Sequence, residues 1–250
     1  MKILGIIPAR WASSRFPGKP LVKIGSKTMI ERVYEQSSKA LDYVVVATDD
    51  KRIFEEVKRF NGQVVITSDK HESGTDRCAE ALNLFQEKTG RKFDVVVNIQ
   101  GDEPFIQGDQ IKDIINCFNE PDTQIATLIK KITEAEIVFD PGCPKVIINT
   151  NSEAIYFSRS TIPHIYNSDE KDWFYKHTFY EHLGLYAYKS EILYEITKLA
   201  PSPLETTESL EQNRWLENGF KIKITETDHE NISIDTQEDL ARIIKQGFVD

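Results

Sequence analysis

Cysteine and methionine are scarce in this chain. Of its 250 residues, three are cysteine and two are methionine. Cys78, Cys117 and Cys143 lie far apart and have no Cys-x-x-Cys spacing, so they form neither a zinc site nor the disulfide framework of a small secreted domain. We therefore expect reduced thiols, most of them buried.

Long apolar segments and an excess of positive charge are missing as well. No segment approaches the roughly 18 apolar residues of a membrane span, and the N-terminus lacks the apolar region of a signal peptide. We therefore expect a cytoplasmic protein without a membrane partner. The net charge of −9 and the pI of about 5.2 argue against a protein that coats nucleic acid. Anionic ligands must be met by local groups of cations.

Histidine and serine signatures of common hydrolases are also lacking. The five histidines show neither His-x-x-x-His nor His-Glu-x-x-His spacing, which argues against a zinc hydrolase. There is no Gly-x-Ser-x-Gly elbow for a serine nucleophile. The chemistry must be sought in other residues.

The first half of the chain alternates short apolar strands with helical patterns. Valine-rich runs at 43–47 and 93–99 are typical of parallel strands covered on both faces. Helices are expected over 28–39, where Thr28 and Glu31 form a capping box, over 51–60, ended by Gly62, and over 76–87. This half predicts an α/β fold with a doubly wound, mostly parallel, Rossmann-like sheet.

The pattern changes past residue 124. Short strands are expected at 125–129, 145–148 and 154–157, with turn residues before the last, which predicts antiparallel hairpins. We interpret residues 1–250 as a single domain in which about 125–190 form a hairpin-rich subdomain. The charged stretch 166–176 lacks apolar periodicity and is expected to be a mobile loop. Helices at 191–199 and 204–218, a strand at 221–226 and a helix after Asp235 complete the chain.

Three cations follow the first expected strand. Arg10, Arg15 and Lys19, with Gly18, lie in one loop at the strand's carboxyl end, where open α/β sheets bind ligands. Each alone reads as a solvated surface charge, but together they suit a polyanion such as a nucleoside triphosphate. Pro20 follows Lys19, so the loop is not a Walker A motif and any metal must be held elsewhere.

Two aspartates are candidates for that metal. Asp102 follows the valine-rich strand, and Asp235 follows Ile232-Ser233-Ile234. A carboxylate beside a triphosphate needs a cation between them, and hard oxygen ligands favour magnesium. Asp102 could instead be a turn residue. Asp235 could be a plain N-cap in a capping box with Glu238, a role that is compatible with a metal.

Two further segments could recognise the rest of a ligand. Ser73, Gly74 and Thr75 join a strand to a helix and could read a base edge, although helix capping explains them about as well. Arg159 follows an apolar strand, and its planar guanidinium suits bidentate capture of a carboxylate.

Several strings of the chain, taken in order, resemble one family. They are Ile-Pro-Ala-Arg (7–10), Ser-Arg (14–15), Pro-Gly-Lys-Pro-Leu (17–21), Ser-Gly-Thr (73–75), Gln-Gly-Asp-Glu-Pro (100–104) and Ile-Asp-Thr (234–236). The resemblance extends from Ile7 to Leu240 and is to the CMP-Kdo synthetases, the 3-deoxy-manno-octulosonate cytidylyltransferases. It implies a nucleotidyltransferase fold, a homodimer, and transfer of CMP from CTP to Kdo, giving CMP-Kdo and pyrophosphate for lipopolysaccharide synthesis.

The resemblance also implies roles for residues. Asp102 and Asp235 would hold Mg²⁺ and, with Arg10 and Lys19, form the catalytic set. Arg10, Arg15, Lys19, Ser73, Gly74 and Thr75 would bind the nucleotide. The sugar pocket would be lined by Gln100, Arg159, His182, Tyr186, Glu211 and Gln212. From the residues alone, His182 is as readily a structural histidine, and Glu211 and Gln212 a solvated helix face.

Other functions remain open. The acceptor could be another acidic sugar, amino-Kdo or sialic acid, although sialic acid synthetases lack Phe-Pro-Gly-Lys-Pro-Leu. A non-catalytic nucleotide-binding regulator on the same fold is expected to have lost a metal carboxylate or a loop cation. This chain retains all five candidates, which are Arg10, Arg15, Lys19, Asp102 and Asp235.

Overall fold

The computed structural model describes residues 1–12, 16–230 and 232–247. They form two compact units. The first contains Met1–Lys112, Lys189–Thr197 and the segment after residue 231, and the second contains Asp113–Tyr188 and Lys198–Glu230. The second unit exceeds the expected subdomain of about 125–190, because segments on both sides of those residues join it.

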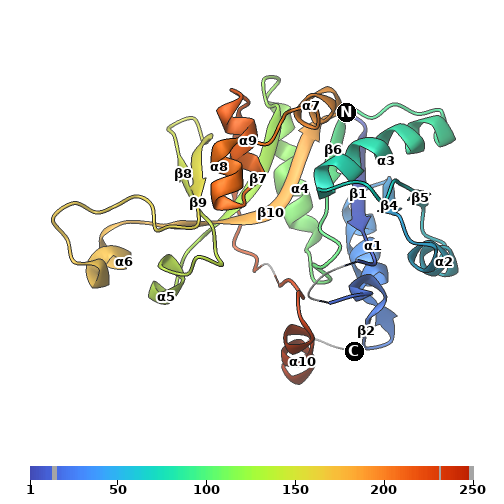
Figure 1. Ribbon diagram of the computed structural model, residues 1–250, viewed down its shortest axis with the longest axis horizontal. Helices are drawn as coiled ribbons and strands as arrows, with labels where there is room; N and C mark the ends of the chain where they lie inside the picture. The colour runs from blue at the N-terminus through green and yellow to red at the C-terminus, as the bar shows by residue number, and fades with distance from the viewer. Residues whose placement is uncertain (13–15, 231, 248–250) are drawn as a thin grey trace. The chain divides into compact units, whose positions relative to one another are not determined.

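The first unit is built on a parallel sheet (Figure 1) with strand order β6-β1-β4-β5. Gly5 of β1 pairs with both Val44 and Val97, so β1 is an inner strand. The strands are nearly continuous apolar runs, as is typical of parallel strands covered on both faces. They are β1 (Ile3–Ala9), β4 (Val44–Thr48), β5 (Val64–Ile66) and β6 (Val95–Asn98).

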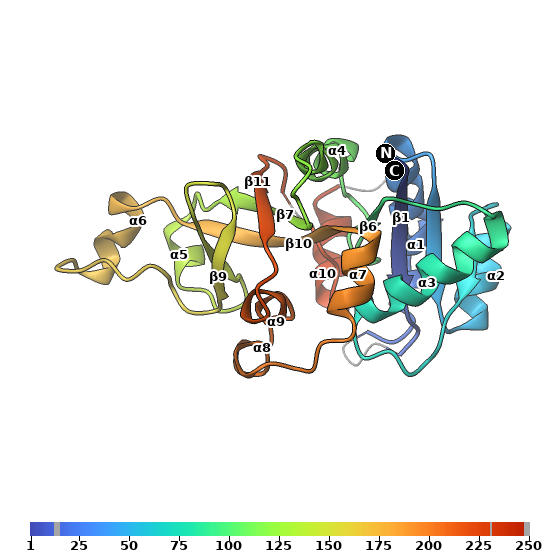
Figure 2. The same cartoon turned by 90° about the horizontal axis from the view of Figure 1, so that it is seen from above.

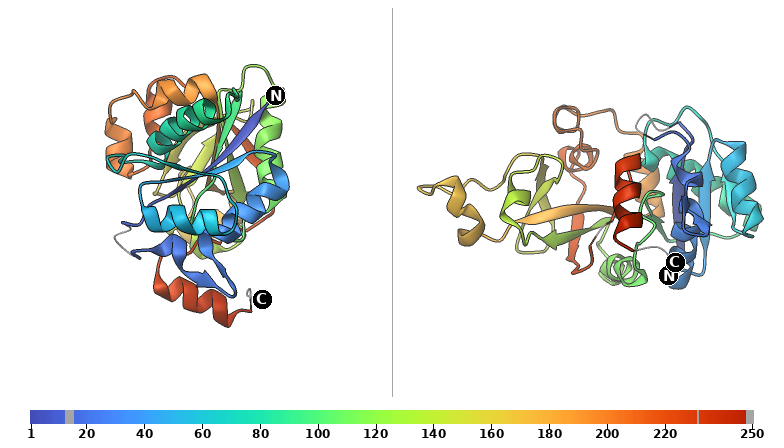
Figure 3. Two further views of the ribbon diagram at one scale, coloured as in Figure 1. Left: turned by 90° about the vertical axis from the view of Figure 1, so that its right-hand side faces the viewer. Right: turned by 90° about the horizontal axis from the view of Figure 1, so that it is seen from below.

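Helices connect these strands. α1 (Met29–Ala40) follows β1, α2 (Lys51–Arg59) follows β4, and α3 (Gly74–Thr89) follows β5. Because crossovers are right-handed and the chain returns across the sheet after β5, α3 covers the face opposite α1 and α2 (Figure 3). α7 (Ser190–Ile196) lies beside α3 (Figure 2). The predicted doubly wound α/β architecture is confirmed.

Two helix ends differ from the predictions. Thr28 is the N-cap of α1, but its side chain makes no capping hydrogen bond, so the expected box with Glu31 is not formed. After α2, Asn61 and not Gly62 takes the left-handed conformation, with φ of 60°. The Gly62 N–H then donates to the Val57 carbonyl at 2.9 Å, as in a Schellman motif.

The C-terminal helix packs on a small hairpin of the first unit. After the short helix η1 (Lys19–Leu21), β2 (Lys23–Ile24) and β3 (Lys27–Thr28) pair antiparallel. α10 (Gln237–Lys245) lies next to this hairpin (Figure 3). Both contribute to one buried apolar cluster, which contains Phe16, Ile24, Met29, Ile234 and Ile243.

The second unit contains antiparallel pairs. β10 pairs antiparallel with β7, and β8 with β9, which confirms the expected hairpins, while β11 is parallel to β7. The sequence pattern predicts no strand over Tyr180–Lys189, where the structure has β10. The strands are β7 (Ile125–Lys131), β8 (Lys145–Ile148), β9 (Ala154–Ser158), β10 (Tyr180–Lys189) and β11 (Ile222–Glu226).

The stretch expected to be a mobile loop, 166–176, is folded. It contains η3 (Glu170–Asp172) and α6 (Trp173–Lys176). Trp173 is 5% exposed, packs with Ile132 and Phe179, and donates from its indole to the Ser168 carbonyl at 3.1 Å. One buried tryptophan anchors a segment whose other residues are mostly polar, a feature that periodicity does not reveal.

The helix expected over 204–218 is broken in two. α8 (Pro203–Glu208) ends at Ser209, which has φ of 51°, and α9 (Gln212–Glu217) follows. The break brings the Glu208 carboxylate to β9, where it accepts from the Ser158 hydroxyl at 2.6 Å. The remaining helices are α4 (Gly108–Asn116), η2 (Cys117–Asn119) and α5 (Ala135–Val138).

Cys78 and Cys117 are buried, Cys143 is partly buried, and all three are free thiols, as expected. Within the described ranges, no helix has the length and apolar character needed to cross a membrane.

Candidate active site

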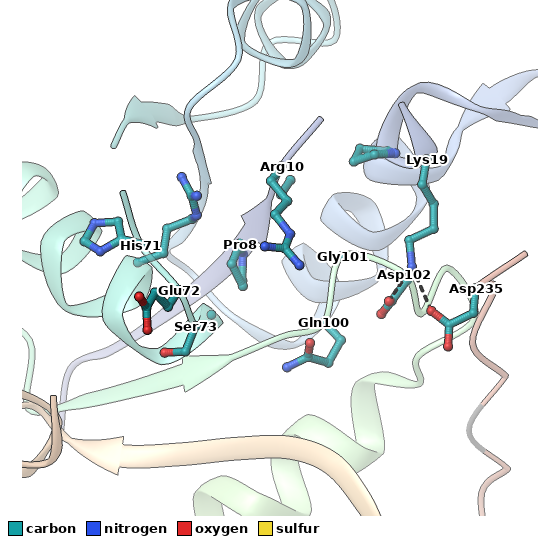
Figure 4. A pocket seen from close by; sticks show the side chains of 14 residues that line it. Pro8, Arg10, Lys19, His71, Glu72, Ser73, Gln100, Gly101, Asp102 and Asp235 are labelled. Atoms are coloured by element: carbon teal, nitrogen blue, oxygen red, sulfur yellow. Dashed lines mark hydrogen bonds and ion pairs between the residues drawn. The ribbon is translucent and has the colours of Figure 1, made fainter. Parts of the chain in front are cut away.

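A pocket of the first unit lies at the carboxyl ends of its parallel strands (Figure 4). β1 leads into it at Arg10, β6 leads into it at Gln100 and Asp102, and the loop between β5 and α3 contributes residues 71–74. Lys19 and Asp235 also line the pocket. The sheet therefore gathers residues far apart in the sequence at the edge where open α/β sheets bind ligands.

Lys19 joins the two candidate metal carboxylates. Its ammonium lies 2.6 Å from Asp102 Oδ2 and 3.1 Å from Asp235 Oδ1 (Figure 4). The side chains of Lys19, Asp102 and Asp235 are 12%, 28% and 32% exposed, so the group is partly shielded but reachable from the pocket. Two carboxylates that share one cation in this way can equally share a metal ion.

Two glycines permit this approach. A Cβ on Gly101 would lie 2.9 Å from the Pro8 carbonyl oxygen, so only glycine lets the loop after β6 pass so close to β1. Gly18 has φ of 73°, and a Cβ there would lie 2.8 Å from the Trp11 ring. The Gly18 N–H donates to the Trp11 carbonyl at 3.0 Å, and the Arg52 guanidinium lies 3.3 Å above the Trp11 ring. These contacts position the start of η1 and therefore Lys19.

Asp235 is not the N-cap that its sequence position predicts. The N-cap of α10 is Thr236, whose hydroxyl accepts from the Asp239 N–H at 3.1 Å while the Asp239 carboxylate accepts from the Thr236 N–H at 3.0 Å. The capping box is thus shifted by one residue from the expected pair of Asp235 and Glu238. Relieved of that role, the Asp235 carboxylate faces Lys19.

Of the other two predicted phosphate ligands, Arg10 and Arg15, the structure describes only Arg10. Arg10 is exposed and lines the pocket. Arg15 lies outside the described residues. The structure therefore brings Arg10 and Lys19 of the basic loop to one pocket, on either side of Gly101 (Figure 4).

The predicted base loop is only partly at the pocket. Ser73 and Gly74 line it, and the Ser73 hydroxyl also caps α3 by accepting from the Asp76 N–H at 3.1 Å. Thr75 is 2% exposed and is not part of the lining. Arg77 is buried too and donates to Asp49 Oδ2 at 2.7 Å, which anchors α3.

His71 is a lining residue that the sequence reasoning left without a role. Its Nε2 is paired with the carboxylate of Glu80 on α3, and the same carboxylate accepts from the Ser68 N–H at 2.8 Å. Glu80 thereby holds the loop before α3. Its place in the His-Glu-Ser-Gly-Thr string, directly before Ser73 and Gly74, is the sequence signal for a position at the pocket.

The predicted sugar residues other than Gln100 belong to the second unit. His182 and Tyr186 lie on β10 with their ring centroids 5.3 Å apart, and the Trp215 ring of α9 is 5.1 Å from Tyr186. The His182 Nε2 is 3.1 Å from the Thr127 hydroxyl. Burial of the imidazole lowers the pKa of His182 to about 3, so this ring is neutral near pH 7.

One polar atom of α9, the Gln212 Nε2, is buried without a hydrogen-bond partner among the described residues. The Tyr186 hydroxyl on β10 is buried as well, with the Thr127 side chain within hydrogen-bonding reach. Burial, with Tyr188 and Glu211 nearby, holds the pKa of Tyr186 well above its ordinary value, so the hydroxyl remains a donor. Because buried polar groups normally have partners, an atom such as the Gln212 Nε2 indicates a place where a polar ligand binds.

Arg159 is held by backbone carbonyls in this structure. Its guanidinium donates to the carbonyls of Glu208, Pro141 and Ser209 at 2.7, 3.0 and 3.4 Å. Its backbone N–H donates to the Glu208 carboxylate at 2.9 Å. The carbonyl acceptors fix the orientation of the Arg159 guanidinium, while the Glu208 carboxylate beside it offsets part of its charge.

Lys145 resembles Arg159 in its surroundings and was missed by the sequence reasoning. It is fully buried, and its ammonium donates to the carbonyls of Asp140 and Cys143 at 2.7 and 2.6 Å. Burial lowers the pKa of Lys145. Lys145 and Arg159 thus both donate to backbone carbonyls of the same turn, 140–143.

Comparison with known proteins identifies the family. Residues 4–224 match the family model described as cytidylyltransferase. The chain is 56% identical over 248 residues to a 3-deoxy-manno-octulosonate cytidylyltransferase of Parabacteroides distasonis, covering 98% of this chain and 97% of that one. It is 57% identical over 243 residues to the enzyme of that name from Bacteroides thetaiotaomicron, covering 96% of each.

Solved structures agree. A CMP:2-keto-3-deoxy-manno-octonic acid synthetase complexed with CTP superposes with a TM-score of 0.89 at 36% identity, covering 99% of each chain. A 4-diphosphocytidyl-2C-methyl-D-erythritol synthase from Anaerococcus prevotii superposes with a TM-score of 0.61 at 16% identity, which shows the fold alone. From the family model and the relatives of more than 50% identity, the chain belongs to the 3-deoxy-manno-octulosonate cytidylyltransferases, a branch of the cytidylyltransferase family.

Proposed function

We propose that this protein transfers CMP from CTP to Kdo, giving CMP-Kdo and pyrophosphate. The observation that carries the proposal is the group of Arg10, Lys19, Asp102 and Asp235 around one pocket at the carboxyl ends of the parallel strands. This group offers cations for a triphosphate and carboxylates for a metal. The substrates CTP and Kdo, which the names of the related proteins indicate, fit this group of charges.

The reaction needs positioning and charge neutralisation more than a protein nucleophile. The anomeric hydroxyl of Kdo attacks the α-phosphorus of CTP in line, an oxygen–phosphorus bond to pyrophosphate breaks, and the hydroxyl proton is lost. Arg10, Arg15 and Lys19 bind the triphosphate and stabilise the charge on the departing pyrophosphate. Ser73 and Gly74 border the base. Thr75, buried in the first turn of α3, supports them from within that helix.

Asp102 and Asp235 are suited to hold magnesium. Both carboxylates already face one cation, the Lys19 ammonium, within 3.1 Å, and carboxylate oxygen is the ligand that magnesium prefers. No group of three metal-ligating side chains occurs in the described parts of the chain, so phosphate oxygens and water would complete the coordination. When bound, the metal would neutralise phosphate charge and acidify the attacking hydroxyl.

Residues of the second unit are proposed to bind the sugar acid. Arg159 pairs with the carboxylate of Kdo, and Tyr186 and Gln212 direct buried donors at its hydroxyl groups. His182 is neutral and can hydrogen-bond a hydroxyl without adding charge. Glu211, next to Tyr186, offers acceptor oxygens.

We further propose a cytoplasmic homodimer, since the cytoplasm supplies CTP and magnesium. The family resemblance implies the homodimer, and Ile155 on the hairpin strand β9, which is 55% exposed, offers an apolar side chain for such an interface. Sedimentation velocity on the wild type and on Ile155→Asp tests this. A monomeric wild type would contradict it.

Pyrophosphate release tests the proposed activity. CTP, UTP, ATP and GTP are each combined with Kdo, amino-Kdo and sialic acid, and we expect release with CTP and Kdo at least tenfold above every other pair. Equal or greater release with amino-Kdo or sialic acid would reassign the acceptor. Binding of CTP without release with any sugar would make the protein a nucleotide-binding regulator.

A further inference from the structure

The Lys19 ammonium lies where a metal shared by Asp102 and Asp235 would lie. It contacts one oxygen of each carboxylate, at 2.6 and 3.1 Å, and Figure 4 shows its amino group pointing between them. Lys19 is separated from Asp102 by 83 residues and from Asp235 by 216. The fold therefore brings three charges from distant segments together, and these contacts do not follow from local structure.

A cation is needed at this position even without a ligand. The Asp102 and Asp235 carboxylates both lie within 3.1 Å of the Lys19 ammonium, so they are close enough to repel each other. Their side chains are only 28% and 32% exposed, and this partial shielding from solvent strengthens the repulsion. Lys19 supplies the compensating charge. In this state its own charge is engaged by the protein and is not directed at a phosphate.

Lys19 and a divalent ion exclude each other at these oxygens. Magnesium binds carboxylate oxygen at about 2.0–2.1 Å, so an ion shared by the two aspartates would compete with the ammonium for the oxygens that it contacts. Lysine is suited to exchange, because its charge is a compact group on a flexible four-carbon stem. The pocket that Lys19 lines also contains Arg10, so a triphosphate there offers new anionic oxygens to the released ammonium.

We infer that Lys19 is an internal counter-ion that makes metal binding depend on nucleotide binding. This inference rests on the proposed function, which assigns the metal to Asp102 and Asp235. Without nucleotide, Lys19 holds the two carboxylates and keeps divalent ions weakly bound. When the triphosphate binds, Lys19 moves to its oxygens and the carboxylates become available. Metal and nucleotide therefore bind with positive coupling, and each raises the affinity for the other by the same factor.

Manganese binding to the nucleotide-free protein tests the inference. Water proton relaxation reports Mn²⁺ held on the slowly tumbling protein, and it needs no turnover. We expect weak binding by the wild type and about tenfold tighter binding by Lys19→Met, in which the competing ammonium is gone. CTP without sugar should tighten Mn²⁺ binding strongly in the wild type and much less in Lys19→Met.

Lys27→Met is the matched control. Lys27 lies in the same unit and pairs with Glu35 at 2.6 Å, so its removal changes the net charge by the same amount without touching the site. We expect its Mn²⁺ affinity to equal that of the wild type. Lys19→Gln, which keeps donors but not the charge, serves if Lys19→Met folds poorly. Folding is checked by the melting temperature, which Mn²⁺ should raise more in the Lys19 variant than in the wild type.

The outcomes separate this inference from the proposed function. If Asp102→Asn retains the Mn²⁺ binding that the wild type shows with CTP, the metal assignment itself is wrong. If Asp102→Asn abolishes that binding but folded Lys19→Met binds Mn²⁺ no tighter than Lys27→Met, the metal site stands and the counter-ion role of Lys19 is overturned. Tighter binding in both lysine variants would assign the effect to net charge and also overturn it.

Discussion

The cations of the two candidate sites are bound by different kinds of acceptor. In the first unit, Lys19 pairs with two carboxylates, so its charge is balanced within the protein. In the second unit, Lys145 and Arg159 are bound by backbone carbonyls. A carbonyl orients a cation without neutralising it, whereas a carboxylate does both. In the proposed mechanism, the site of the first unit exchanges partners when its ligands bind, whereas the proposed sugar ligands of the second unit are oriented in advance.

The largest expected effect is loss of a carboxylate from the balanced site. Asp102→Asn and Asp235→Asn should each lower kcat by about a hundredfold to a thousandfold, because an amide is a poorer magnesium ligand than a carboxylate. Steady-state pyrophosphate release at saturating Mg²⁺ measures it. Asp109→Asn, at a 69% exposed side chain of α4, is the control and should be nearly silent.

The Asp235 variant also distinguishes a metal ligand from a structural residue. Thr236 caps α10, so the substitution should leave the helix and the melting temperature nearly unchanged. Activity of Asp235→Asn close to that of the wild type would remove Asp235 from the mechanism.

Removing the exchanging cation should have the next largest effect. Lys19→Ala loses a charge-assisted contact to the triphosphate, at a cost on the order of 2–4 kcal/mol, or roughly a thirtyfold to thousandfold fall in kcat/KM for CTP. The KM for Kdo should change little. Unaltered kinetics with CTP would exclude Lys19 from triphosphate binding and leave it only its ion pairs with Asp102 and Asp235.

A smaller effect is expected at the pre-oriented site. Arg159→Lys keeps the charge but loses the planar fork, so the KM for Kdo should rise about tenfold while the KM for CTP stays near normal. Arg242→Lys, an exposed arginine on α10, controls for the substitution itself. A defect confined to CTP would move Arg159 to the phosphates, and no defect would leave it the purely structural role of holding the turn 140–143.

The smallest effect concerns pH and stability at His182. Its pKa is about 3 in the folded protein and about 6.5 when unfolded, so the unfolded chain binds more protons between these values. The stabilisation is therefore complete above about pH 6.5 and is lost as the pH falls toward 3. The residue is only partly buried by surface area, so we expect a loss of only about 1 kcal/mol between pH 7 and 5.

Urea unfolding at both pH values, compared with His182→Gln, isolates this term from the carboxylates that titrate in the same range. The wild type should lose more free energy of unfolding than the variant. Equal losses would mean that His182 is not kept neutral by its surroundings.

The sequence by itself determined the parts that depend on local patterns. The valine-rich runs predicted β4 and β6, and the basic loop and Asp102 were expected at the strand ends, where the structure places Arg10, Lys19 and Asp102. Strand alternation and the polarity of a parallel sheet are properties of neighbouring residues, so they can be read from the chain. The hairpin β8–β9 could be predicted for the same reason, because its turn residues lie between two short apolar strands.

Only the tertiary structure decided which groups meet. The pairing of Lys19 with Asp102 and Asp235 spans 83 and 216 residues, and no local pattern records it. The same holds for Trp173, which anchors a polar segment, and for the buried donors of Tyr186 and Gln212. Even the cap of α10 depended on it, because Asp235 and Thr236 are both good N-caps. In the structure Ile234 and Ile243 belong to the same apolar cluster as Ile24 of the β2–β3 hairpin. With this packing, Thr236 caps the helix and Asp235 lines the pocket.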